Sequence, residues 1–337
     1  MSRTPSAHWI SDSLSKRVPY TDTVHYDPYE ISLGYGHQEI GHLLDIIAEP
    51  QASRPSTIKA LRLLADVLPG REDEAIQLHA FEILKELILQ PPNGILLHAL
   101  RALQKLAVRS DIAILLTPHI PRLVEIIHPE IEVSIRVEAC SLLRHMADLI
   151  GPVDQFTEGD IPILITVASS SDLCTKPFMI ESFRLLSRLT NVQKVRIPII
   201  SSSELLKKIV TSILDPDLQN EALNLASNIA MDKSHRGKVA LLESDILDTV
   251  TTLLKSRSVE TRLAALSLIA LLAVPKDGKE LLSTMPDVAD TLKKISSDDP
   301  DLQCRNAAKK CRIFVAEIPF GKVIMGDIVD PSKPVPK

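Results

Sequence analysis

The sequence predicts an all-α fold, a right-handed α-solenoid of about seven stacked helical repeats. Three observations predict it: apolar residues recur at helical spacing, the pattern returns about every 40 residues, and each copy carries a small residue at the same place. The clearest copy spans residues 259–273. Counting from Ala265, apolar residues follow at the third, fourth, seventh and eighth positions. That spacing collects side chains on one face of a helix.

Seven such positions, which we call anchors, align along the chain. They are Ala60, Ala99, Ala139, Ser182, Ala222, Ala265 and Ala308. Successive anchors are 39, 40, 43, 40, 43 and 43 residues apart. A period near 40 residues with a small residue at each anchor is typical of α-solenoids of the HEAT or armadillo kind. Each anchor is expected to lie on its own helix, which we call an anchor helix.

A second, amphipathic helix is expected before each anchor helix. The solenoid begins with residues 38–48, and the later amphipathic helices are expected at 81–88, 120–127, 161–167, 205–213, 246–254 and 288–295. Pro-containing turns such as 90–94 and 298–300 separate the two helices of a repeat. The glycine-containing segments 234–238 and 275–279 are interpreted as short links between repeats. The predicted organisation is an N-terminal arm (1–36), a solenoid (37–316) and an irregular Pro-containing tail (317–337).

Composition restricts the class of protein. A chain of 337 residues would often form two domains, but the repeat predicts one continuous core. The net charge of −5 gives no reason to expect nucleic acid or an anionic membrane as a partner. No signal peptide and no apolar run long enough to span a membrane are visible. The four cysteines (Cys140, Cys174, Cys304 and Cys311) lack CxxC spacing, which predicts reduced thiols in a cytoplasmic protein.

The sequence offers no constellation of residues for catalysis. It has no Gly-rich phosphate loop, and its ten histidines are dispersed rather than grouped at metal-ligand spacing. Cys140 and His145 are five residues apart, so a buried thiol beside a groove-facing imidazole explains them better than a nucleophile and its base. We therefore expect a protein that is not an enzyme and has no cofactor, metal or small-molecule substrate.

Aromatic residues are concentrated in the N-terminal arm. It holds the only tryptophan and all four tyrosines of the chain: Trp9, Tyr20, Tyr26, Tyr29 and Tyr35. Tyr and Trp serve as large anchors at protein interfaces, whereas plain disordered tails are poor in them. The arm is therefore expected to dock on a partner protein, to cap the open end of the first repeat, or to do both.

Two positions on each anchor helix, two and six residues after the anchor, are not needed for the core and share one face. They read Arg62/Asp66, Arg101/Lys105, Ser141/His145, Arg184/Arg188, Asn224/Asn228, Ser267/Leu271 and Lys310/Phe314. Six of these fourteen residues are Arg or Lys, which suits an extended acidic segment in the groove. The candidate groove residues are Arg62, Arg101, Lys105, His145, Arg184, Arg188, Asn224 and Asn228. The alternative is a solvated face that binds nothing.

Three segments resemble known families. Residues 223–230, Leu-Asn-Leu-Ala-Ser-Asn-Ile-Ala, resemble the end of the third helix of the armadillo consensus, with Asn228 at its groove asparagine. The other repeats lack the Trp and Asn ladder of nuclear-import adaptors. Residues 27–36 and 261–282 resemble the armadillo proteins of ciliary radial spokes, the radial spoke head 14 homologues.

The radial-spoke resemblance implies a non-enzymatic scaffold in the axoneme of the cilium or flagellum. Such a scaffold would bind other radial spoke subunits and support ciliary motility, and the protein would lie in the cytoplasm as part of the cytoskeleton. The alternative function is a soluble armadillo adaptor that binds an acidic extended peptide in its groove.

Overall fold

The computed structural model describes residues 38–90, 93–148, 156, 159–170 and 175–316. The predicted N-terminal arm with Trp9 and the four tyrosines, the C-terminal tail and Cys174 therefore lie outside the described residues. Within the described ranges the regular elements are helices, and no strand occurs. The predicted all-α solenoid is confirmed.

Three kinds of helix alternate along the chain. The anchor helices are α3 (Arg54–Val67), α6 (Leu96–Leu106), α9 (Val133–Ala147), α12 (Lys176–Leu189), α15 (Gln219–Ala230), α18 (Val259–Leu272) and α21 (Leu302–Ala316). The middle helices that precede them are α2 (Gln38–Ala48), α5 (Ala80–Leu89), α8 (Ile120–Ile126), α11 (Asp160–Ser169), α14 (Ser203–Ile213), α17 (Ile246–Leu253) and α20 (Pro286–Asp298). The short helices are α4 (Glu72–Gln77), α7 (Ser110–Leu116) with the 3₁₀ turn η1 (Thr117–His119), α13 (Gln193–Ser201), α16 (Arg236–Glu243) and α19 (Lys276–Ser283).

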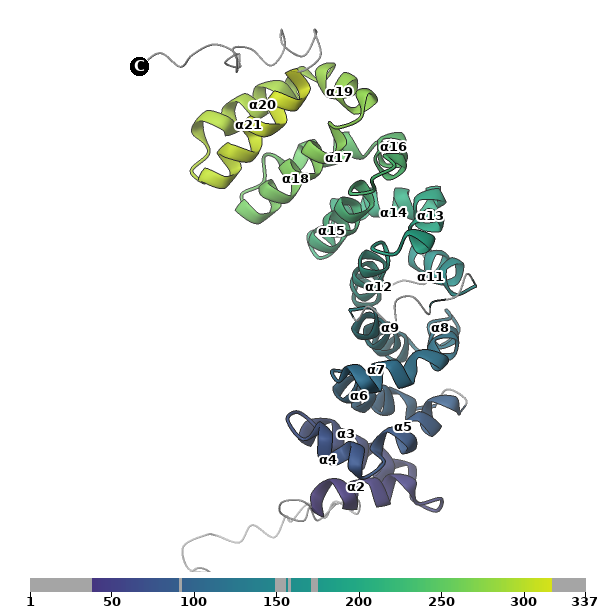
Figure 1. The fold of residues 1–337 in the computed structure, drawn as a ribbon. Coiled ribbons are helices and arrows are strands. Elements are labelled where there is room, and N and C mark those ends of the chain that lie inside the picture. Colours follow the sequence, from purple (N-terminus) through teal and green to yellow (C-terminus); the bar gives the residue numbers. More distant parts are fainter. Residues whose placement is uncertain (1–37, 91–92, 149–155, 157–158, 171–174, 317–337) are drawn as a thin grey trace, which may run out of the picture.

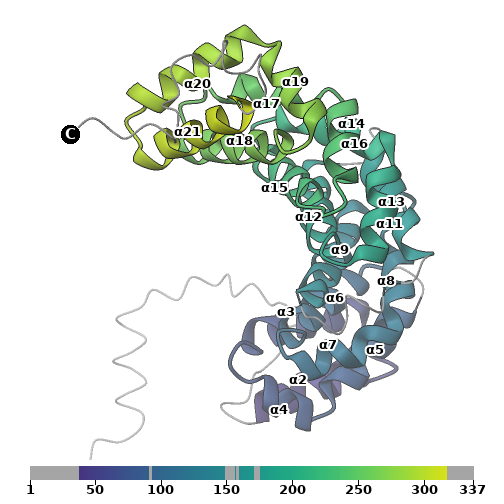
Figure 2. The ribbon, with the colours of Figure 1, turned by 45° about the horizontal axis from the view of Figure 1, so that its top comes forward.

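The helices stack into a curved rod (Figure 1). Each anchor helix packs on the anchor helices before and after it and on the middle helix of its own repeat. The anchor helices line the concave side of the curve, and the short helices α13, α16 and α19 lie on the convex side, as both ribbon views show (Figure 2). We call the surface formed by the seven anchor helices the concave wall.

The anchors are the most deeply buried part of each repeat. Six of the seven anchor residues have no exposed surface, and Ser182 is 5% exposed. The buried apolar residues form one continuous core from Ile40 to Val315. Since each repeat contributes a thin slice of this core, a repeat depends on its neighbours to bury its apolar face. The expectation of a single continuous core is confirmed.

The segments interpreted as links between repeats are instead helical. Residues 236–243 form α16 and residues 276–283 form α19, so the two repeats that contain them have three helices rather than two. Gly237 and Gly278 lie inside these helices, where an added Cβ would clash with the carbonyl oxygen of Ile229 and of Leu272, respectively. These glycines allow a short helix to press against the preceding anchor helix, and they do not mark turns.

In several repeats, the residue three positions before the anchor caps the C-terminal end of the middle helix. Its side chain donates hydrogen bonds to backbone carbonyls at the end of that helix: Arg136 to Ile127, Gln219 to Ile213, Arg262 to Ser256 and Arg305 to Asp299. Helix ends leave several carbonyls without partners, and a long donor side chain from the next helix satisfies them. The same bond fixes the angle between the two helices of a repeat.

Candidate protein-binding surface

The predicted groove residues all lie on the anchor helices of the concave wall. Arg62, Arg101, Lys105, Arg184, Arg188 and Asn224 are exposed, while His145 and Asn228 are half-buried. The helical periodicity therefore predicted correctly that these side chains are not fully buried in the core. Their partners could not be predicted from periodicity, because they come from the neighbouring repeat.

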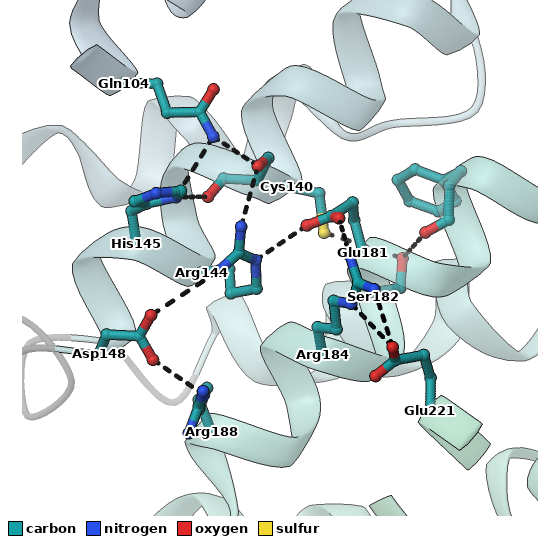
Figure 3. A network of polar contacts seen from close by, with 12 residues as sticks. Gln104, Cys140, Arg144, His145, Asp148, Glu181, Ser182, Arg184, Arg188 and Glu221 are labelled. Carbon is teal, nitrogen blue, oxygen red and sulfur yellow. Dashed lines mark hydrogen bonds and ion pairs between the residues drawn. The ribbon is translucent and has the colours of Figure 1, made fainter. Parts of the chain in front are cut away.

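Two of the predicted arginines are bound by glutamates of the next anchor helix. Arg101 donates from Nε to Oε1 of Glu138 at 2.7 Å. Arg184 donates from Nε and Nη2 to Oε1 of Glu221 at 3.0 and 2.8 Å (Figure 3). In both pairs the arginine lies two residues after one anchor, and the glutamate directly precedes the next anchor. We call such a pair of positions a rung of the wall.

Six rungs join the seven anchor helices. In chain order they are Arg62/His98, Arg101/Glu138, Ser141/Glu181, Arg184/Glu221, Asn224/Ala264 and Ser267/Ala307. The second and fourth rungs are ion pairs, the third has a glutamate opposite a buried serine, and the last two carry no charge.

The third rung is completed by an arginine that sequence analysis missed. Arg144 lies five residues after its anchor and donates from Nε to Oε2 of Glu181 at 2.9 Å. Its Nη1 lies 3.7 Å from Oδ2 of Asp148, and Arg188 binds Oδ1 of the same carboxylate at 2.8 Å (Figure 3). The pattern in the sequence that could have revealed these pairs is a glutamate 37 residues after an arginine, which occurs in all three of them.

Neutral side chains also join neighbouring anchor helices. Gln104 donates to Oγ of Ser141 at 2.6 Å and lies 3.2 Å from Nδ1 of His145, which is also 3.0 Å from the carbonyl oxygen of Ser141. Asn228 donates from Nδ2 to the carbonyl oxygen of Ser187 at 3.1 Å. His145 and Asn228 therefore hold adjacent repeats together, in addition to lining the wall.

The middle of the wall is consequently close to neutral. Arg101, Arg144, Arg184 and Arg188 each bind a carboxylate of the chain itself. Among the described residues, no acidic group forms an ion pair with Arg62 or Lys105. The basic ladder expected from the sequence is present as residues, but among the described residues only Arg62, Lys105 and Lys310, towards its two ends, have no ion pair.

The first rung holds a buried histidine. His98 is 4% exposed, and within the described part of the chain its Nδ1 has no hydrogen-bond partner. Burial, together with the positive charges of Arg62 and Arg101, lowers the pKa of His98 to about 4. The imidazole is therefore neutral at physiological pH.

The last two rungs of the wall, at its C-terminal end, carry no charge. A shallow hollow of about 300 Å³ lies between α18 and α21, and its lining combines Leu266, Ala270 and Ala307 with the polar residues Ser267, Gln303, Asn306 and Lys310. Phe314, further along α21, is 36% exposed. Small and apolar side chains thus replace the charged rungs at this end.

Three described cysteines are free and buried. Burial raises the pKa of Cys140 and of Cys311 to about 12 in each case, and Cys140 lies 3.8 Å from Oγ of Ser182. These thiols stay protonated and are poor nucleophiles. Within the described ranges, no cluster of three or more His, Cys, Asp or Glu side chains has the arrangement needed for a metal ion. None of the helices in those ranges combines the length and apolar character of a membrane span.

Comparisons with known proteins show the fold. The sequence matches no protein-family model and no curated protein. The structure is similar to that of an engineered protein solved by a structural genomics consortium, with a TM-score of 0.72 and 17% identity, covering 85% of this chain and 70% of that one. A designed armadillo repeat protein, solved in complex with the peptide (KR)4, matches with a TM-score of 0.60 and 16% identity, covering 69% of this chain and 99% of that one. The chain therefore has an armadillo-type repeat fold.

Proposed function

We propose that this chain is a non-enzymatic scaffold that holds protein partners against its concave wall. The observation that carries the proposal is the continuous wall of seven anchor helices, tied together by hydrogen bonds and ion pairs between neighbouring repeats. Extended concave surfaces of this kind are what solenoid proteins use for binding. The buried, protonated thiols of Cys140 and Cys311 suit a role that needs no nucleophile.

We further propose that the assembly is the radial spoke of the ciliary or flagellar axoneme. The support is the resemblance of residues 27–36 and 261–282 to the armadillo proteins of radial spokes. The second segment lies in α18 and α19, at the C-terminal end of the solenoid. The first lies outside the described residues. In this role the protein binds other radial spoke subunits and supports motility.

Fractionation of ciliated cells tests this assignment. The tagged protein is expected in salt-washed axonemes, and radial spoke subunits are expected to co-purify with it after axoneme extraction. A protein that stays wholly in the soluble cytoplasmic fraction would contradict the axonemal role, while leaving open its binding of other proteins.

A second candidate function is a soluble adaptor for acidic extended peptides. Exposed Arg62 and Lys105, which have no ion pair among the described residues, favour it. The designed armadillo protein was solved in complex with the peptide (KR)4, so a protein of this fold can bind a peptide. An adaptor would bind an acidic peptide in a salt-sensitive way and would be absent from axonemes.

A further inference from the structure

The first rung lacks the glutamate that is present in the second, third and fourth rungs. In the second, third and fourth rungs the residue directly before the anchor is Glu138, Glu181 or Glu221, and each accepts hydrogen bonds from an arginine of the preceding anchor helix. These glutamate side chains are 13–19% exposed. In the first rung the same position holds His98, which is also largely buried but carries no negative charge.

Arg62 occupies the position of a rung arginine, but no glutamate of the next anchor helix accepts a hydrogen bond from it. It lies two residues after its anchor, as Arg101 and Arg184 do, and it is exposed on the wall. Asp66 lies one helical turn further along α3, but no ion pair joins it to Arg62. Arg101, the other cation close to His98, is already bound to Glu138.

His98 is neutral where the second, third and fourth rungs have a glutamate. Its unpartnered Nδ1 is buried, so an acidic side chain that approaches the wall meets the exposed Arg62 and not this nitrogen. A carboxylate of a partner would give Arg62 the acceptor that Arg101 and Arg184 find within the chain. The chain's own rungs identify the ligand chemistry, since Arg101 and Arg184, the two arginines at the equivalent position, are both paired with a glutamate.

We propose that the first rung is a carboxylate-binding site, in which Arg62 binds an acidic side chain of a protein partner where the chain itself supplies no glutamate. The proposal rests on the proposed scaffold function and names the chemistry of the partner at one point of the wall. It also places recognition of acidic residues outside the middle of the wall, because the middle rungs are filled by the chain itself.

Fluorescence anisotropy with the full-length chain tests the site, using labelled hexaglutamate as the probe and labelled hexaglutamine as its neutral control. Wild-type protein is expected to bind hexaglutamate in preference to hexaglutamine, more weakly as salt is added. Arg62→Gln should weaken binding about tenfold, the loss expected for one charge-assisted hydrogen bond. Asp66→Asn should strengthen it, because a competing negative charge is removed.

His98→Glu is the sharpest variant, because it supplies the missing acid within the chain. The introduced carboxylate would pair with Arg62, as Glu138 pairs with Arg101, and weaken binding of hexaglutamate at least as much as Arg62→Gln does. Ala264→Glu adds the same charge at the equivalent position of the fifth rung and is expected to leave binding within about twofold of wild type. Thermal unfolding of each variant confirms that the solenoid is intact.

Two results would overturn the proposal. One is wild-type protein that does not distinguish hexaglutamate from hexaglutamine. The other is a pair of variants, His98→Glu and Ala264→Glu, that weaken binding equally, because this would indicate a diffuse charge effect. Neither result bears on the scaffold function, which axoneme fractionation tests separately.

Discussion

The middle of the concave wall and its C-terminal end share one backbone arrangement but expose different chemistry. From α6 to α15 the rungs are glutamates held by arginines of the preceding helix. From α15 to α21 the same positions hold Ala264 and Ala307, opposite Asn224 and Ser267. The residue directly before the anchor therefore sets the local chemistry of the wall. It can be changed without disturbing the core, because the anchors themselves are buried in both regions.

The ion pair at the C-terminal end lies beneath the surface instead. Arg262 donates from Nε and Nη2 to the two carboxylate oxygens of Asp299 at 2.9 and 3.0 Å, and the two side chains are 9% and 5% exposed. Burial acts to raise the pKa of Asp299, but the hydrogen bonds from Arg262 and from the backbone N–H of Asp301, together with the positive charges of Arg262 and Arg305, outweigh it and the pKa is lowered. The two regions thus use ion pairs differently: partly exposed between anchor helices in the middle, and buried between α18 and the end of the next middle helix, α20, at the C-terminal end.

The largest expected effect comes from breaking the buried pair. Arg262→Leu leaves Asp299 buried without its counter-charge and removes the donor to the carbonyl of Ser256. We expect a loss of about 3–5 kcal/mol in the free energy of unfolding, measured by urea denaturation. Arg184→Leu, which breaks an exposed pair on the wall, should cost less than about 1 kcal/mol. Equal losses in the two variants would remove the distinction between the regions.

The second prediction concerns the close packing of the short helix α19 on the anchor helix α18, and a smaller effect is expected. In Gly278→Ala the new methyl group meets the carbonyl oxygen of Leu272, and we expect a loss of about 1–3 kcal/mol. Gly41→Ala is the matched control, because the nearest atom to a Cβ there is 3.9 Å away. Helix propensity should make that variant more stable by up to about 1 kcal/mol. Thermal unfolding of both variants checks the prediction, and a stable Gly278→Ala protein would contradict the tight packing.

Sequence alone could predict the anchors and the wall, because both follow from helical periodicity. Ala265 and its apolar companions repeat at fixed spacing, and burial depends mainly on that spacing. The short helices α16 and α19 could not be recognised, because Gly237 and Gly278 are equally typical of turns. Their role depends on a contact with another helix, which local sequence does not contain.

The ion pairs of the rungs could not be predicted from the sequence either. Arg101 and Arg184 were correctly expected on the wall, but the free positive charge assigned to them is cancelled by Glu138 and Glu221 of the next repeat. Pairing across repeats depends on how far one helix is displaced along another. That displacement is a property of the stacked structure, and it appears in the sequence only as a 37-residue spacing once the structure is known.

The third prediction concerns the histidine that replaces glutamate in the first rung. The folded chain holds the pKa of His98 at about 4, below the ordinary value of 6.5, so the unfolded chain binds more protons between these values. Stability should therefore fall as the pH is lowered from 6.5 towards 4, by roughly 1–2 kcal/mol between pH 7 and pH 5. His98→Gln should lose this part of the pH dependence. An unchanged slope in that variant would contradict a buried neutral imidazole.

The smallest effect is expected for a single rung of the middle region. A double-mutant cycle of Arg184→Gln and Glu221→Gln should give a coupling energy of about 0.2–1 kcal/mol, because the arginine is largely solvated. Added salt should reduce this coupling. A coupling well above that range, insensitive to salt, would mean that the rungs carry much of the solenoid's stability, as Arg262 and Asp299 are expected to do at the C-terminal end.

Site-specific photo-crosslinking in cells tests the central claim, that protein partners occupy the concave wall. A photoreactive amino acid is placed at Ser267, exposed on anchor helix α18, and in a separate variant at Asp277, exposed on the short helix α19. We expect crosslinks to a defined partner protein from position 267 and none from position 277. Crosslinks that form only from position 277 would contradict the account.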